Sequence, residues 1–133
     1  MGQYILDTNM VTHVVKGQVQ ALSRLKREAE SSDICVSSIT RGEIFFGLAK
    51  RPEAKNLHQL MHEFFKRVDV FPWTDATAKV YGTLRAELEK KGKTMGPLDL
   101  LIAAHALERE SILVSCDKAF HKIKNLEVED WTV

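Results

Sequence analysis

The apolar positions of this chain fall into two kinds of run that alternate along its length. Short, mostly apolar runs predict strands at residues 4–6, 34–36, 68–71, 112–115 and 126–128. Between these runs, apolar residues recur at the three- and four-residue spacing of amphipathic helices. This spacing predicts helices over residues 8–16, 19–30, 39–49, 53–67, 75–90 and 97–107. The alternation indicates the α/β class, with a short central parallel sheet covered on both faces.

Four acidic residues fall where this fold would make a carboxylate chemically useful. Asp7 directly follows the first strand, and Asp117 follows the fourth. Glu43 lies in the first half of the helix after the second strand, and Asp99 is the only charge in the apolar run 97–104. Open parallel sheets bind ligands at the carboxyl ends of their strands, so we expect all four side chains to converge at one edge.

Four carboxylates at one place repel one another unless a cation lies between them. Oxygen ligands suit Mg²⁺ or Mn²⁺, and such ions activate water and stabilise charge on a phosphodiester under attack. Short polar residues stand beside the acids and could hold waters or orient the carboxylates. They are Thr8, Asn9, Ser38 and Ser115.

Each acid also has an ordinary structural interpretation. Asp7 could cap the helix that follows it, and Asp117 could be a turn residue. Asp99 could simply complement the positive end of a helix. Glu43 stands three residues after Thr40, so this pair could form a capping box. The placement of all four acids at one edge is what favours a metal site.

Four ordered motifs around these acids resemble the motifs of PIN-domain nucleases. They are Leu6-Asp7-Thr8-Asn9, Ser37-Ser38-Ile39-Thr40-x-x-Glu43, Gly96-Pro97-Leu98-Asp99-x-x-Ile102-Ala103-x-His105-Ala106 and Val114-Ser115-x-Asp117-x-x-Phe120. More narrowly, the chain resembles the VapC toxins of type II toxin–antitoxin pairs. The Gly-Pro-x-Asp motif and the Asp130-Trp131 ending look most like the enteric subgroup.

The resemblance implies a single PIN domain over residues 1–133, a Rossmann-like three-layer α/β/α sandwich. It implies an Mg²⁺- or Mn²⁺-dependent endoribonuclease that inhibits translation, and it carries metal-site roles onto Asp7, Glu43, Asp99 and Asp117. The subgroup implies initiator tRNA as the substrate, cut in its anticodon stem-loop. The implied partners are a neutralising VapB-type antitoxin, a second copy in a homodimer, and promoter DNA through the antitoxin alone.

Two other function classes stay open. A phosphatase with Asp7 as its nucleophile would want a second aspartate two residues on, where this chain has Asn9. A trapped aspartyl-phosphate would support that reading. A non-catalytic binding module would use its apolar faces to hold a partner protein, and it would co-purify with that partner without cleaving RNA.

Charge and composition add little until the acids are considered. Nineteen Lys and Arg against eighteen Asp and Glu give a net charge of +1, which argues against a histone-like basic protein. If divalent ions neutralise the four acids, the remaining surface is more basic than that sum suggests, as RNA binding requires.

The expected location is the cytoplasm, without contact with a membrane. No apolar run approaches the roughly 20 residues that span a bilayer, and the start of the chain lacks a signal-peptide pattern. Cys35 and Cys116 show neither metal nor disulfide spacing.

Other polar and aromatic residues have simpler interpretations. His105, on the apolar helix, is expected to be packed and hydrogen-bonded. Three lysines before that helix either contact RNA phosphates or form a solvated helix end; they are Lys90, Lys91 and Lys93. Three cations are expected to form plain surface: Arg24, Lys26 and Arg27. Four aromatic residues are expected in the core or at a dimer or antitoxin surface: Phe45, Phe46, Phe64 and Phe65.

Overall fold

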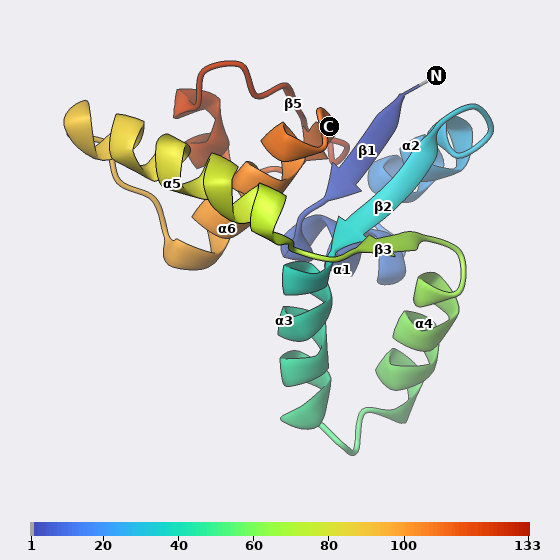
Figure 1. Ribbon diagram of the computed structural model, residues 1–133. Helices are drawn as coiled ribbons and strands as arrows, with labels where there is room; N and C mark the ends of the chain where they lie inside the picture. Colours follow the sequence, from blue (N-terminus) through green and yellow to red (C-terminus); the bar gives the residue numbers. More distant parts are fainter. Residues whose placement is uncertain (1) are drawn as a thin grey trace.

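A sheet of five parallel strands runs through the middle of the structure, in the order β3-β2-β1-β4-β5 (Figure 1). The computed structural model describes residues 2–133. The strands are β1 (Gln3–Leu6), β2 (Asp33–Ser37), β3 (Asp69–Phe71), β4 (Ile112–Val114) and β5 (Val128–Glu129). Because β1 lies between β2 and β4, the carboxyl ends of these three strands are neighbours.

The central residues of the inner strands are apolar because both faces of the sheet are covered. Alternate residues of a strand point to opposite faces. Tyr4 and Leu6 accordingly pack in one core cluster, whereas Ile5 packs in the other. Strand neighbours repeat the pattern, with Val36 in the first cluster and Cys35 in the second.

Six helices and one short 3₁₀ helix complete the fold. They are α1 (Thr8–Val15), α2 (Val19–Glu28), α3 (Ser38–Ala49), α4 (Lys55–Phe65), α5 (Asp75–Lys90), α6 (Pro97–Glu108) and η1 (Lys118–Lys122). Buried residues of α1 to α4 join the first core cluster, and those of α5, α6 and η1 join the second. Figure 1 shows α3 and α4 as a hairpin that projects from the carboxyl end of β2.

The predicted α/β class and the type of every predicted element are confirmed. Most predicted bounds differ from the observed ones by one or two residues. The last strand was predicted at residues 126–128 but lies at Val128–Glu129, because pairing of Val128 with Leu113 and of Glu129 with Val114 defines it. Among residues 2–133, no helix combines the length and apolar composition that crossing a bilayer requires.

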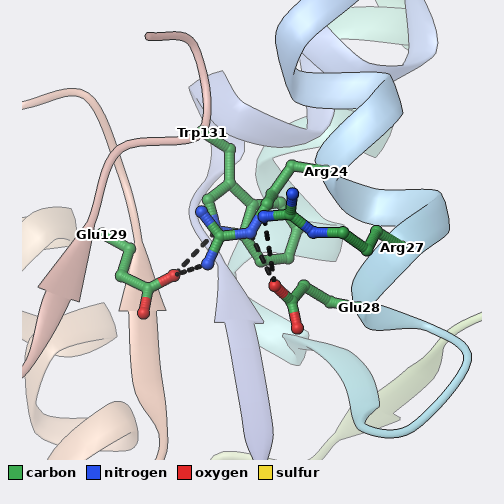
Figure 2. A network of polar contacts seen from close by, with 5 residues as sticks. All are labelled: Arg24, Arg27, Glu28, Glu129 and Trp131. Atoms are coloured by element: carbon green, nitrogen blue, oxygen red, sulfur yellow. Dashed lines mark hydrogen bonds and ion pairs between the residues drawn. The ribbon is translucent and has the colours of Figure 1, made fainter.

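A polar network fixes the C-terminal segment against α2 (Figure 2). Arg24 donates from Nε to Glu28 at 2.6 Å and from Nη2 to Oε1 of Glu129 at 2.8 Å. Its guanidinium lies 5.5 Å from the ring centroid of Trp131, and the Trp131 indole N–H donates to the same Glu129 oxygen at 3.0 Å. Trp131 is buried and meets Tyr4 edge-on, with ring centroids 5.1 Å apart.

The prediction that Arg24 forms plain surface is therefore wrong, whereas Lys26 and Arg27 are exposed. The reason is tertiary. The partners of Arg24 at the C-terminus lie more than 100 residues away, so local charge spacing gives no sign of them.

Candidate active site

Asp7 lies at the carboxyl end of β1 and begins α1. Its Oδ1 accepts the N–H of Met10 at 2.9 Å, so Asp7 is the N-cap of the helix, and the capping interpretation is confirmed. The side chain is only 4 % exposed. A cap needs one carboxylate oxygen, which leaves the second available for another partner.

The electrostatic surroundings of Asp7 are unfavourable to its charge. Burial raises the pKa of Asp7, while hydrogen bonds from the Ser115 hydroxyl and the Met10 N–H lower it. Repulsion from Asp99 and Asp117 raises this pKa further. None of the described groups that shift this pKa is a cation.

Glu43 lies in the second turn of α3, and a residue of α1 forms a hydrogen bond with its carboxylate. The Thr8 hydroxyl donates to Oε1 of Glu43 at 2.7 Å. The helix begins after Ser37, whose Oγ accepts the N–H of Ile39 at 3.1 Å. The capping-box interpretation of Glu43 is thus wrong, because Thr40 lies inside the helix, buried, with no described partner for its hydroxyl.

Asp99 occupies the first turn of α6, where the helix dipole favours an anion. Burial raises the pKa of Asp99, and repulsion from Asp117 and Glu43 raises it further. Its Oδ2 lies 3.5 Å from where a side-chain carbon on Gly96 would be. This is an ordinary van der Waals distance, so the backbone of residue 96 lies directly beside the carboxylate.

Asp117 caps η1, as a turn residue would. Its Oδ1 accepts the N–H of Ala119 at 2.9 Å, and its own N–H donates to Ser115 Oγ at 3.0 Å. The side chain is exposed, beside the carboxyl end of β4. Ser115 thus contacts the backbone of Asp117 and the carboxylate of Asp7, which links two of the acids.

The four acids repel one another at this edge of the sheet. The negative charges of Asp99 and Asp117 raise the pKa of Asp7, and those of Asp117 and Glu43 raise the pKa of Asp99. Within residues 2–133, no three His, Cys, Asp or Glu side chains already converge tightly enough to surround an ion. The chemistry of these donors nevertheless suits a hard divalent cation, because all four are carboxylates. The carboxyl groups of Asp7 and Asp99 also have a raised pKa, and a bound cation would offset the cost of their charge.

The four predicted supporting residues divide into two groups. Thr8 and Ser115 contact the acids directly. Ser38 instead accepts the backbone N–H of Trp73 at 3.1 Å, and Asn9 is exposed. Sequence reasoning missed Trp73, because a lone tryptophan after an edge strand gives no signal of this contact.

Two segments that neighbour Asp99 and Asp117 in the chain are rich in lysine. Lys91 and Lys93 are exposed in the loop between α5 and α6, and Lys90 ends α5. Lys118 is exposed beside Asp117 on η1, and Lys122 of the same segment donates to the Thr94 carbonyl at 3.0 Å. This bond ties the loop before α6 to η1, so the two basic segments are neighbours.

The aromatic residues of α3 and α4 separate into core and surface. Phe64 is buried, whereas Phe45 and Phe46 are 52 % and 64 % exposed. The Arg41 guanidinium lies between the rings of Phe45 and Phe65, 5.1 and 5.2 Å from their centroids. The two helices therefore present an exposed aromatic and basic surface.

Comparison with known proteins agrees with this geometry. A profile of the PIN domain matches residues 4–126. Ribonuclease VapC2 of Haemophilus influenzae is 35 % identical over 133 residues, covering 98 % of this chain and 99 % of that protein. The chain belongs to the VapC group of the PIN-domain family. The family expected from the four motifs is thereby confirmed.

Further VapC proteins are similar over nearly their whole length. The tRNA(fMet)-specific endonuclease VapC of Shigella flexneri is 31 % identical, covering 99 % of this chain and all of that protein. Among solved structures, VapBC2 of Rickettsia felis bound to a promoter DNA fragment gives a TM-score of 0.92 at 32 % identity, covering 97 % and 98 % of the two chains. DNA-bound VapBC of Salmonella typhimurium gives 0.89 at 30 %, covering 98 % and 99 %.

Proposed function

We propose that this chain is the toxin of a type II toxin–antitoxin pair and acts as a divalent-metal-dependent endoribonuclease. The observation that carries the proposal is the group of acids at this edge of the sheet, where burial and repulsion from neighbouring carboxylates raise the pKa of Asp7 and of Asp99. Membership of the VapC group, whose relatives are named ribonucleases, supports the same reaction class.

In this proposal Asp7 and Asp99 are the central metal ligands, and Glu43 and Asp117 are peripheral or orient a water. Bound Mg²⁺ or Mn²⁺ would supply activation of water and neutralisation of phosphodiester charge. The chain itself fixes the donors. Thr8 orients Glu43 through its hydroxyl, and the cap contact with α1 fixes Asp7. The exposed lysines of η1 and of the loop before α6 would bind RNA phosphates near the cleaved bond.

We propose initiator tRNA as the substrate, cut in the anticodon stem-loop, with inhibition of translation as the result. The relatives of Shigella flexneri and Salmonella typhimurium, both 31 % identical, are named tRNA(fMet)-specific endonucleases. The relatives of Haemophilus influenzae and Rickettsia felis carry the broader name ribonuclease, at 35 % and 32 % identity.

The proposed partner is a small VapB-type antitoxin that neutralises the toxin and contacts promoter DNA on its behalf. The solved structures of Rickettsia felis and Salmonella typhimurium relatives, which are VapBC assemblies bound to DNA, support this assignment. We further propose one PIN domain over residues 1–133, a homodimer, and action in the cytoplasm. A short reading frame for a DNA-binding protein beside this gene would support the pairing.

The decisive experiment is cleavage of purified tRNA. Wild-type protein is incubated with initiator tRNA or an elongator tRNA, with Mg²⁺, Mn²⁺ or excess EDTA, and cuts are mapped by primer extension. The proposal predicts metal-dependent cuts confined to the anticodon stem-loop of initiator tRNA, absent for Asp7→Asn. Full cleavage in EDTA, or by folded Asp7→Asn, would overturn the catalytic assignment. Equal cutting of the elongator tRNA would overturn only the substrate.

A further inference from the structure

Two consecutive serines at the start of α3 connect that helix to α6. Ser37 Oγ lies 2.7 Å from Nδ1 of His105. Ser38 Oγ accepts the N–H of Trp73, whose indole N–H in turn donates to the Leu101 carbonyl at 3.0 Å. The start of α3 is therefore joined to α6 once directly and once through Trp73.

The direct contact is fully enclosed in the protein. Ser37 and His105 are both 0 % exposed. Burial is the largest cause of a lowered pKa at His105, so the ring is neutral near pH 7. Its Nε2 has no hydrogen-bond partner among the described residues, which leaves Ser37 as the single polar partner of the ring. A buried pair of this kind has one favourable geometry, and deviations cost the hydrogen bond.

Packing alone does not account for a histidine at this position. The neighbours of His105 on α6 are Ile102, Ala103, Ala104 and Ala106, all buried. An apolar side chain of similar volume would avoid leaving a ring nitrogen unpaired. Buried polar contacts can instead specify one arrangement of two elements among several that are equally well packed.

The two helices carry two of the four acids. Glu43 lies six residues after Ser37 on α3, and Asp99 lies six residues before His105 on α6. Each separation is roughly 9 Å along the helix axis, at 1.5 Å per residue. The negative charge of Glu43 contributes to the raised pKa of Asp99, so the two carboxylates lie near enough to repel each other. The two helices joined by the contact of Ser37 with His105 are therefore the helices that carry these two repelling carboxylates.

We propose that His105 and Ser37 form a positioning pair that sets the separation between Asp99 and Glu43, and thereby the affinity of the site for a divalent ion. This inference rests on the proposed metal-dependent nuclease. His105 is a positioning residue and touches neither RNA nor ion, because it is enclosed in the core. If the bond between Ser37 and His105 is lost, α3 and α6 can shift relative to each other, and the two carboxylates shift with them.

The test compares variants of the pair in the full-length protein. His105→Leu and Ser37→Ala each remove the contact, whereas His105→Asn keeps a polar group at the distance of Nδ1 from the backbone. Thr77→Val is the matched control. Thr77 lies on α5, is as buried as His105, and its hydroxyl donates to the Glu108 carboxylate of α6 at 2.8 Å. Mn²⁺ binding to metal-free protein is measured by electron paramagnetic resonance, and the Mg²⁺ concentration for half-maximal RNA cleavage is measured separately.

The pair predicts a specific pattern. His105→Leu and Ser37→Ala should each weaken Mn²⁺ binding about tenfold, in the range seen when groups that orient metal ligands are removed. The double variant should be no weaker than either single variant, and the half-maximal Mg²⁺ concentration should shift equally. His105→Asn should stay near wild type. Thr77→Val should lower thermal stability without changing Mn²⁺ affinity.

Three results would overturn the inference. They are unchanged Mn²⁺ affinity in folded His105→Leu and Ser37→Ala, additive losses in the double variant, and an equal loss in Thr77→Val. If His105→Leu does not fold, Ser37→Ala and His105→Asn decide the question. The proposed function fails in a different way, because wild type would then bind no Mn²⁺, or Asp7→Asn would bind it equally well.

Discussion

The Thr8 hydroxyl donates to Oε1 of Glu43 at 2.7 Å, although 35 residues separate the two in the chain. Thr8 is the first residue of α1, immediately after Asp7, and Glu43 belongs to α3. One short hydrogen bond therefore ties the start of α1, which Asp7 caps, to the helix that carries Glu43. It fixes which way the glutamate points before any ion is bound.

Replacing Thr8 by valine should weaken catalysis without unfolding the protein. The valine keeps the shape of the side chain but leaves Glu43 without its donor, so we expect about a tenfold loss of cleavage at limiting Mg²⁺. Thr8→Ser should retain most activity. Thr83→Val, which changes an exposed threonine on α5, is the control. Initial cleavage rates across a Mg²⁺ titration provide the measurement, and equal rates for Thr8→Val and wild type would contradict the expectation.

Asp7→Asn should lose activity and gain stability. The amide still accepts the Met10 N–H through its oxygen, so the cap of α1 is retained. The buried negative charge disappears, and with it the repulsion from Asp99 and Asp117. We expect cleavage to fall about a thousandfold while the free energy of unfolding in EDTA rises by about 1 kcal/mol. Urea unfolding followed by circular dichroism measures the second effect, and a less stable variant would contradict it.

The metal-free protein should become less stable as pH rises through the range where these acids ionise. Burial raises the pKa of Asp7 above the usual 3.8, and burial likewise raises that of Asp99. Above pH 3.8 the unfolded chain loses these protons first, so the folded state binds more of them. The stability that comes from protonation of Asp7 and Asp99 is therefore complete below pH 3.8. It is lost as pH rises through the raised pKa values that the two groups have in the folded protein. The difference in unfolding free energy between wild type and Asp7→Asn/Asp99→Asn, measured in EDTA, should follow this trend and vanish at low pH.

Divalent ions should reverse that loss. An ion that binds only the folded state stabilises it by about 2.7 kcal/mol at a concentration one hundred times its Kd. We expect Mg²⁺ or Mn²⁺ to raise the melting temperature of wild type and to leave Asp7→Asn/Asp99→Asn unchanged. Ca²⁺ at the same ionic strength tests whether a larger divalent ion stabilises the protein equally well. An equal shift in both proteins would assign the effect to general salt screening.

Arg24 should contribute to stability far more than its neighbour Arg27. The Arg24 side chain is 29 % exposed and makes two ion pairs, whereas that of Arg27 is 69 % exposed and reaches Glu28 only at 3.7 Å. Arg24→Met leaves Glu129 and Glu28 short of a partner and should cost about 1–2 kcal/mol. Arg27→Met should cost less than about 0.5 kcal/mol. Chemical denaturation of both variants tests this, and equal costs would contradict the network in Figure 2.

The sequence was a good guide to local structure wherever one kind of interaction dominates. Unbroken apolar runs indicated β1, β2 and β4, because strands covered on both faces bury most of their side chains. Ser37 and Pro97 marked the starts of α3 and α6, since caps act within a few residues. The prediction placed the last strand too early in the chain. Glu129 belongs to that strand because it pairs with Val114, and its polar side chain gives no sign of this pairing.

The chain's sequence by itself determined the order of strands and helices, the position of each acid at or near the end of an element, and the family. These follow from short-range patterns and ordered motifs. Only the tertiary structure decided that Thr8 holds Glu43, that Ser37 holds His105, and that Arg24 holds the C-terminal segment. Each of these contacts joins residues 35 to 105 positions apart. Their partners are chosen by the packing of helices on the sheet, which no local spacing encodes.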